Sequence, residues 1–264
     1  MKKIIDGLLI ALQFLTTIPF HSQIEWDKDC AKWSVRFFPL VGLIGGILIA
    51  AQLILLLEYT HVSTVIIAFW ILFFGVLYTG GLHLDGWMDM SDAIFSYRDQ
   101  ERKLEIMSDS RVGAFGVISL LFLLGFRFLF IYEIIEFSSL HQLLLIILIP
   151  FLAKAALTAL LIEGKFAKST GMAAAYKDVI SKKDLRYVVG FIVLVSGVMI
   201  MVDFSLTTPI MILIIASIFL YWFLKSIIYK EFGGITGDTL GALAEGEETF
   251  LWLVLWLLHY FAMV

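Results

Sequence analysis

The sequence predicts an all-α fold: a polytopic integral membrane helical bundle of about seven transmembrane helices, preceded by one N-terminal interfacial helix. Of its 264 residues, 61% are hydrophobic and only 16% are charged, whereas about 25% of the residues of a soluble domain are charged. Apolar stretches of bilayer length recur along the chain, and lysine and arginine gather in alternate connections between them. No linker is visible, so residues 1–264 are expected to form a single integral membrane domain.

The first helix is expected over residues 4–18, either lying at the membrane interface or packed on the bundle. Asp6 interrupts its apolar run and no small-residue cleavage site follows, which argues against a signal peptide. Seven further stretches approach the length of about 20 residues that a span requires. They cover residues 37–57, 62–82, 113–132, 140–162, 187–202, 206–223 and 249–264. The fifth and sixth are so close together that they predict a tight helical hairpin.

The distribution of basic residues supports these spans. The connections at 58–61, 133–139 and 203–205 contain no lysine or arginine, whereas those at 21–36, 83–112, 163–186 and 224–248 contain 3, 4, 6 and 2. Basic residues concentrate on the cytoplasmic side of membrane proteins. We therefore expect a multi-pass protein of the cytoplasmic (inner) membrane, with its N-terminus in the cytoplasm and its C-terminus outside. A net charge of −4 without a basic stripe argues against nucleic-acid binding.

One acidic motif, GGLHLDGWMDMSDA, points to a chemical function. Its aspartates, Asp85, Asp89 and Asp92, are spaced by four and three residues, which places them on one face of a helix. Such clustered negative charge is costly unless a cation neutralises it. Mg²⁺ binds carboxylate oxygens and keeps positions open for substrate phosphates. The motif thus predicts a Mg²⁺ site facing the cytoplasm, with His83 as a base or a phosphate contact; the alternative is a solvated helix face beside the lipid headgroups.

The next stretch, RDQERKLEIMSDSRVGAFG, brings positive charge close to these acids. Residues 99–107 predict a short amphipathic helix. Arg98 and Arg111 are candidate phosphate ligands, because arginine binds phosphate in a bidentate way, and Asp109 is a candidate metal or hydroxyl partner. The alternative is that Asp109 or Ser110 caps a helix and that Arg111 extends to the membrane interface.

A glycine-rich run, GGITGDTLG at residues 233–241, opens a helical stretch. Backbone N–H groups at such a turn bind anions, or Asp238 completes the metal site from across the bundle; the alternative is a flexible loop with a Thr or Asp cap. Glu245 lies seven residues after Asp238 on the same helix face and is expected to line the same cavity. Glu247 and Glu248 are expected on a solvated face.

Two basic residues, Arg127 and Lys154, fall inside predicted spans. Because charge is expensive there, each is expected to pair with an acid or to approach a substrate phosphate; extension toward the interface is the alternative. Lys168, beside the run GMAAAY, is expected to contact an anionic ligand or lipid, unless it only sets the topology.

Together these motifs resemble the cobalamin synthase family, the adenosylcobinamide-GDP ribazoletransferases. The resemblance rests on GGLHLDGWMDMSDA, RDQERKLEIMSDSRVGAFGV and GGITGDTLGA, and it extends to ALQFLTTIP and RFFPLVGLIGG. It implies a Mg²⁺-dependent membrane enzyme of cobalamin nucleotide-loop assembly. That enzyme transfers the cobinamide phosphate of adenosylcobinamide-GDP to α-ribazole, or to α-ribazole 5′-phosphate, and releases GMP.

The local motifs and the resemblance together suggest roles for individual residues. The expected catalytic residues are His83, Asp85, Asp89, Asp109 and Arg111, and the expected metal ligands are Asp85, Asp89, Asp92 and Asp238. The expected substrate-binding residues are Arg98, Ser110, Lys154, Lys168, Thr236, Gly237 and Glu245. Lys154 and Lys168 stand where the family pattern has arginine, so these two positions lack the forked geometry of a guanidinium.

Other functions fit parts of the sequence. CDP-alcohol phosphotransferases and membrane prenyltransferases also use aspartate clusters to hold Mg²⁺, and a secondary transporter would suit the charges inside spans. The polar residues crowd one membrane face, which favours an interfacial enzyme. The sequence leaves open which residues contact corrin, guanine or ribazole, how many metal ions bind, and the oligomeric state; a homo-oligomer is compatible with it.

Overall fold

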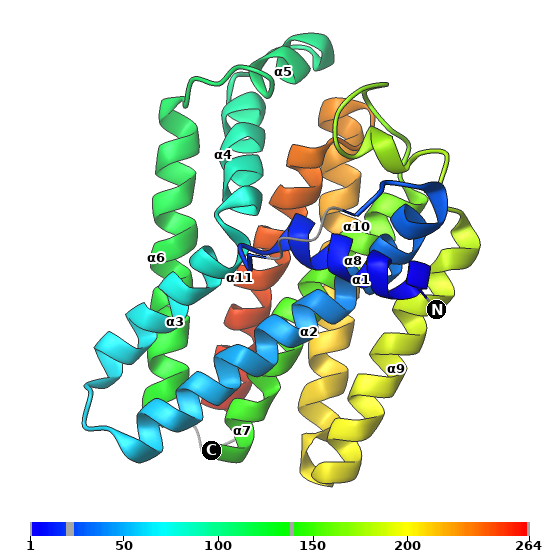
Figure 1. The fold of residues 1–264 in the computed structure, drawn as a ribbon. Helices are drawn as coiled ribbons and strands as arrows, with labels where there is room; N and C mark the ends of the chain where they lie inside the picture. Colours follow the sequence, from blue (N-terminus) through cyan, green and yellow to red (C-terminus); the bar gives the residue numbers. More distant parts are fainter. Residues whose placement is uncertain (1, 20–23, 138–139, 263–264) are drawn as a thin grey trace.

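The computed structural model describes residues 2–19, 24–137 and 140–262, which form a bundle of helices (Figure 1). The predicted all-α fold is confirmed: within these ranges the only β contact is an isolated parallel bridge between Phe166 and Ile235. The main helices are α1 (Lys2–Leu15), α2 (Lys28–Tyr59), α3 (Thr64–Thr79), α4 (Leu82–Phe95), α5 (Gln100–Ile106), α6 (Ala114–Phe137), α7 (Leu140–Leu143), α8 (Leu148–Glu163), α9 (Leu185–Val202), α10 (Thr207–Phe232) and α11 (Gly237–Ala262). Short 3₁₀ turns are η1 (Leu144–Ile147), η2 (Ala174–Tyr176), η3 (Lys182–Asp184) and η4 (Phe204–Leu206).

Five helical stretches of the described chain are long and apolar enough to cross a membrane. They are Lys28–Tyr59, Ala114–Glu136, Leu144–Glu163, Lys182–Val202 and Phe204–Phe232. α3 and α4 make a sixth only if they are taken as one span with a sharp bend. The expected seventh span, 249–264, corresponds to the apolar half of α11, a helix that already begins at Gly237. The predicted hairpin is confirmed, since only η4 separates α9 from α10.

The outer surface of the bundle is apolar. Large side chains on its outer helices are strongly exposed, for example Phe122 on α6 (63%), Met201 on α9 (88%) and Phe219 on α10 (64%). A water-soluble protein rarely exposes continuous apolar surface of this kind. These faces are therefore suited to contact lipid acyl chains.

The connections of the bundle segregate to two ends (Figure 1). The α2–α3 connection, η4 and the C-terminal end of α11 lie at one end, whereas α5, residues 164–181 and the α10–α11 turn lie at the other. The second end carries the basic connections that were expected on one membrane face. The arrangement thus agrees with the alternation of charge along the chain.

Helix α8 forms the centre of the bundle and is buried along almost its whole length. Helix α2 packs directly on its backbone: a Cβ on Gly42 would lie 2.3 Å from the Pro150 carbonyl oxygen, and a Cβ on Gly46 would lie 2.3 Å from that of Ile147. Only glycine allows helices to approach so closely. α8 is consequently a rigid element on which the surrounding helices are placed.

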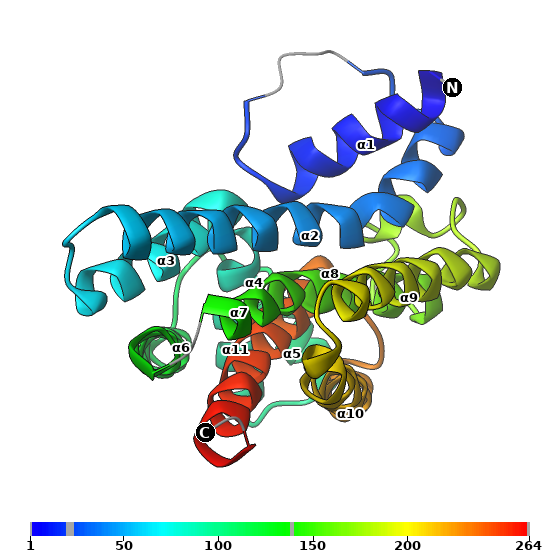
Figure 2. The same cartoon turned by 90° about the horizontal axis from the view of Figure 1, so that it is seen from below.

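The N-terminal helix α1 lies along the start of α2, at the edge of the bundle (Figure 2). Gly7 makes the contact, since a Cβ there would lie 2.4 Å from Cβ of Trp33. With 14 residues, α1 is shorter than the roughly 20 residues of a span. Of the two placements expected for this helix, the structure shows packing on the bundle.

Candidate active site

A sharp break between α3 and α4 positions the acidic motif. Gly80 and Gly81 both have positive φ angles, 65° and 75°, a conformation that favours glycine. The chain bends by 90° at this break. Thr17, which follows α1, donates its backbone N–H to the Tyr78 carbonyl (2.9 Å) and its hydroxyl to the Leu77 carbonyl (2.7 Å). The carbonyl groups released by the break are thereby satisfied.

Helices α4 and α11 then meet backbone to backbone. A Cβ on Gly86 would lie 2.5 Å from the Asp238 carbonyl oxygen, and a Cβ on Gly241 would lie 3.1 Å from Cα of His83. Each helix contributes a glycine where the other approaches, so neither can shift without losing the contact. The acidic motif and the glycine-rich run, far apart in sequence, are thus brought together as expected.

Four aspartates gather at this junction, and Lys168 is a cation within electrostatic range of one of them, Asp238. Asp89 lies within electrostatic range of Asp85, Asp92 and Asp238. None of the four forms an ion pair with any residue that the structure describes. Within the same part of the chain, no three His, Cys, Asp or Glu side chains already surround a single point as metal ligands do. The carboxylates therefore repel one another across a space that a cation would fill.

Asp92 has a second set of contacts. Its two carboxylate oxygens accept hydrogen bonds from the backbone N–H groups of Gly113 and Gly116, each at 2.8 Å. These are orphan donors at the start of α6, and an acid there is also favoured by the helix dipole. Asp92 thus fixes α6 against α4. A cap from Asp109 or Ser110 was one alternative for this segment, and the structure shows Asp92 bound to these N–H groups instead.

The DSR element lies on the exposed connection between α5 and α6. Arg111 donates to both oxygens of Asp109, from Nε at 3.0 Å and from Nη2 at 2.6 Å. This guanidinium holds the pKa of the Asp109 carboxyl down at about 2. The Arg111 side chain is 87% exposed, and Ser110 and Arg98 are exposed as well. The structure does not bring these residues into the pocket that His83 lines.

The start of α11 forms a capped turn that a ligand can approach. The Thr236 hydroxyl accepts from the Thr239 N–H (3.2 Å), and the Thr239 hydroxyl accepts from the Thr236 N–H (2.8 Å). A Cβ on Gly237 would meet nothing within 4 Å. Lys168 lines a pocket with Gly237 and Asp238, and its Nζ donates to the Leu104 carbonyl at 3.1 Å. A helix N-terminus and an ammonium group are thus placed together.

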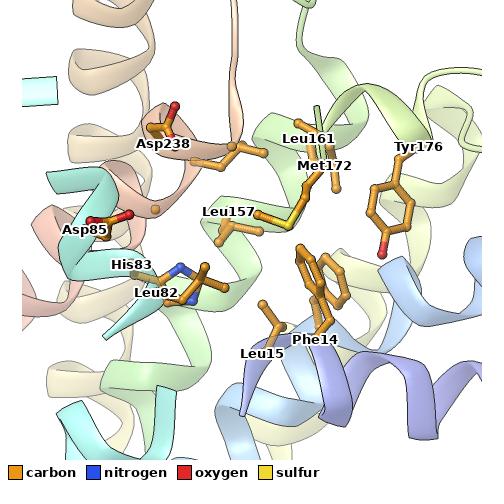
Figure 3. A pocket seen from close by; sticks show the side chains of 15 residues that line it. Phe14, Leu15, Leu82, His83, Asp85, Leu157, Leu161, Met172, Tyr176 and Asp238 are labelled. Atoms are coloured by element: carbon orange, nitrogen blue, oxygen red, sulfur yellow. The ribbon is translucent and has the colours of Figure 1, made fainter. Parts of the chain in front are cut away.

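Another pocket lies next to the pocket of Lys168, between α1, α2, α4, α8 and α11 (Figure 3). We call it the main pocket. His83, Asp85 and Asp238 line its polar end. Its other end is apolar and is lined by Phe14, Leu15, Phe38, Leu157, Leu161 and Tyr176. His83 is buried, and its Nε2 has no hydrogen-bond partner in the described part of the chain. An unsatisfied nitrogen beside unpaired carboxylates marks this end as the reactive one.

Comparison with known proteins identifies the family of the chain. Residues 7–256 match the family model described as cobalamin-5-phosphate synthase. The chain belongs to the cobalamin-5-phosphate synthase family. Curated proteins named adenosylcobinamide-GDP ribazoletransferase are similar along their whole length: one from Geobacillus sp. (strain WCH70) is 44% identical, with 100% of both chains covered. One from Halalkalibacterium halodurans is 38% identical, with 97% of both covered. No solved structure gives a significant match.

This cobalamin-5-phosphate synthase family member also has charged groups deep in its bundle. Arg127 of α6 pairs with Glu245 (2.7 Å) and with Glu248 (3.5 Å) of α11, and it donates to the Thr249 hydroxyl from Nη2 (2.6 Å). Lys154 of α8 is buried and interacts electrostatically with both glutamates and with His83. Ion pairing, one of the alternatives for Arg127, is what the structure shows. Glu245 belongs to this group and does not line either pocket.

The expectation that Glu247 and Glu248 face solvent is wrong. Glu247 is fully buried and Glu248 is 9% exposed, because α11 packs against α4, α6, α8 and α10. Sequence reasoning also missed the apolar end of the main pocket. Its residues come from α1, α2, α8 and η2, and nothing local in those segments reveals that they converge. The flanking lysines drew attention to the run GMAAAY, which ends at Tyr176, but they do not predict an aromatic pocket wall.

Proposed function

We propose that this protein is a Mg²⁺-dependent membrane transferase that moves the cobinamide phosphate of adenosylcobinamide-GDP to α-ribazole, or to α-ribazole 5′-phosphate, and releases GMP. Family membership and the names of its relatives support this substrate pair. The observation that carries the proposal is the junction of α4 and α11, where unpaired carboxylates and the buried His83 line one pocket. Rival phosphotransferase, prenyltransferase and transporter functions are disfavoured by the family assignment.

The residues at the junction suit a hard divalent cation. Carboxylate oxygens are the ligands that Mg²⁺ prefers, and within the described part of the chain Asp85, Asp89 and Asp238 form no salt bridge that would compete for them. Asp92 can join them only while it also holds α6. Mg²⁺, when bound, would neutralise the diphosphate and the departing GMP phosphate.

The protein's own groups have defined tasks in the transfer. The ribose 3′-hydroxyl of α-ribazole attacks the cobinamide-linked phosphorus, a new P–O bond forms, and the bond to the GMP phosphate breaks. The hydroxyl proton passes to Nε2 of His83, whose lone pair has no protein partner among the described residues. Lys168 and the first turn of α11 hold phosphate oxygens beside Asp238. Arg111, kept in a fixed orientation by Asp109, and Arg98, in the connection before α5, offset phosphate charge of the bound substrate.

The reaction is tested with the purified protein in liposomes. Adenosylcobinamide-GDP and α-ribazole are supplied with Mg²⁺, and GMP and the cobalamin product are measured together. We expect both to appear in equal amounts and to disappear when the metal is chelated. Release of CMP or pyrophosphate from the corresponding alternative substrates, with no GMP, would assign the site to a rival function.

We also propose that the pockets face the cytoplasm from the inner membrane, with the N-terminus on that side. The segregation of basic connections to one end supports this orientation (Figure 1). Since the native Cys30 is buried, single cysteines report the topology. In right-side-out vesicles, a membrane-impermeant maleimide should label Ser205→Cys and leave Ser169→Cys unlabelled; the reverse pattern would invert the orientation.

A further inference from the structure

The main pocket joins two different chemical environments (Figure 3). Asp85, His83 and Asp238 lie at one end, and Leu157 and Met172 lie between them and the aromatic side chains of the other. Leucine and phenylalanine line almost all of this second end, which therefore lacks the polar groups that a charged or strongly hydrogen-bonding ligand needs.

The aromatic end is a built site. Phe14 and Phe38 stack with their ring centroids 5.8 Å apart. Tyr176 meets both rings edge-on, at 6.3 Å and 6.1 Å. The three rings come from α1, α2 and η2, so their arrangement depends on the whole fold and not on local sequence. The rings contact one another and together form an aromatic wall of the main pocket, against which a flat apolar ring system can pack.

One polar group in this end has no use within the protein. Tyr176 is 2% exposed, yet its hydroxyl has no hydrogen-bond partner among the residues that the structure describes. A nearby polar side chain is that of Ser34; its hydroxyl donates to the Ala31 carbonyl at 2.8 Å, and it does not lie in hydrogen-bonding geometry with the Tyr176 hydroxyl. Buried tyrosine hydroxyls normally have a partner, and an unmet one is costly. A ligand that brings a single acceptor would satisfy it.

We propose that the aromatic end binds the base of α-ribazole, and that the Tyr176 hydroxyl donates a hydrogen bond to its one unsubstituted ring nitrogen. This inference rests on the proposed function. The base is a dimethylbenzimidazole: it is flat, it carries two methyl groups, and once glycosylated it offers one acceptor and no donor. Those features match an apolar, aromatic lining with one donor. The ribose then extends toward His83, where its hydroxyl is to be deprotonated.

Other parts of the substrates match this end less well. Guanine carries several donors and acceptors, which the leucine and phenylalanine side chains cannot satisfy. The corrin ring is wider than the base and is bordered by amide groups, so it would need polar contacts along its edge. Both are better suited to the neighbouring pocket of Lys168 and the glycine-rich turn, or to the space outside the two pockets.

The test combines one variant with one substrate analogue. Tyr176→Phe removes only the hydroxyl, and the 5,6-dimethylindole riboside replaces the ring nitrogen by CH. For Tyr176→Phe we expect the KM for α-ribazole to rise about 5- to 10-fold, the range for one lost hydrogen bond, with the KM for adenosylcobinamide-GDP unchanged. The native enzyme should disfavour the indole analogue by a similar factor in KM, and Tyr176→Phe should not discriminate between the two ribosides.

Matched controls make the result specific. Tyr132→Phe changes a tyrosine of α6 that packs against a different part of the hydrophobic core, which includes Leu53, Ile67 and Trp252, and it should alter neither KM. Leu157→Phe narrows the middle of the main pocket and should raise the KM for α-ribazole more than that for the riboside of unsubstituted benzimidazole. If the native enzyme accepts the indole analogue as well as α-ribazole, or if Tyr176→Phe raises only the KM for adenosylcobinamide-GDP, the assignment is overturned. Absence of GMP release from the native enzyme would instead refute the proposed function.

Discussion

Helix α11 carries two groups of acids that differ in whether a basic side chain of the protein pairs with them. Near its middle, Glu245 and Glu248 are buried and paired with Arg127, with Lys154 also in electrostatic range. At its start, Asp238 lies beside the α4 aspartates, and no ion pair to these acids occurs within the described residues. The same helix thus holds one group that the protein neutralises itself and another that it leaves charged.

The difference suggests that the two groups of acids have different roles. A buried pair with good geometry holds two helices in register, and removing one partner exposes the fold to an uncompensated charge. Aspartates that repel one another reduce stability and persist where something outside the protein uses them. We therefore expect changes in the first group to act on folding and changes in the second to act on turnover.

The largest effect on activity is expected from Asp89→Asn. The substitution keeps the shape of the side chain but removes a charge that the cation requires, so GMP release should fall by about 100-fold or more, since even groups that only orient a metal ligand contribute 10- to 100-fold. The thermal midpoint in detergent should stay the same or rise, because repulsion is relieved. Glu58→Gln, an exposed acid at the end of α2, is the control. Full turnover by Asp89→Asn would remove the metal site from the account.

The largest effect on stability is expected from Arg127→Met. It leaves Glu245 and Glu248 buried beside each other without their closest cation, which should destabilise the bundle by about 3–5 kcal/mol. Thermal unfolding of the detergent-solubilised protein measures the loss. Adding Glu245→Gln to this variant should recover a large part of it, because the pair is then removed as a unit. Equal stability of the single and double variants would show that the ion pair is not what binds α6 to α11.

A smaller loss is expected where the two helices touch. Gly86→Ala adds a methyl group 2.5 Å from the Asp238 carbonyl oxygen, so α4 and α11 must move apart and the acids with them. A misplacement of this size should lower kcat by about 10- to 100-fold. Gly125→Ala in α6, where a Cβ would meet nothing within 4 Å, should be silent. If both variants are fully active, the position of Asp238 relative to α4 is not critical.

The smallest effect is expected from Asp109→Asn, which releases Arg111. The pair is exposed, so the thermal midpoint should not change measurably, while turnover should fall about 3- to 10-fold as the guanidinium loses its orientation. The pKa of Asp109 is lowered to about 2, so the pair is present above the ordinary carboxyl pKa and is lost only as the pH falls toward that value. The ratio of native to variant rates should consequently be constant from about pH 6 to about pH 9. A ratio that changes across this range would mean that another titrating group controls Arg111.

Much of this arrangement was predictable because it depends on local pattern. Hydrophobic length predicted the five stretches of the described chain that are long and apolar enough to cross a membrane, although not all seven expected spans qualify. The i, i+4, i+7 spacing predicted the acid face of α4. The run GGITGDTLG predicted the capped start of α11, where Thr236 now forms the cap.

What could not be predicted depends on pairs of segments far apart in the chain. Arg127 and Glu245 were each visible as unusual residues, but only the packing of α6 on α11 pairs them. Glu247 was misread because its helix continues into the bundle and is covered on every side. The 90° bend at Gly80–Gly81 needs two left-handed residues in succession, which a pair of glycines permits but does not require.

The contact between Thr17 and the end of α3 changes how the beginning of the chain is regarded. Residues 2–17 superficially resemble a signal peptide. In the structure, however, Thr17 donates hydrogen bonds to the end of α3, at the bend that precedes His83. Phe14 and Leu15 form part of the wall of the main pocket. Trimming this segment, or exchanging it for a purification handle, would dismantle part of the enzyme. Fusion partners for expression or imaging belong at the opposite terminus.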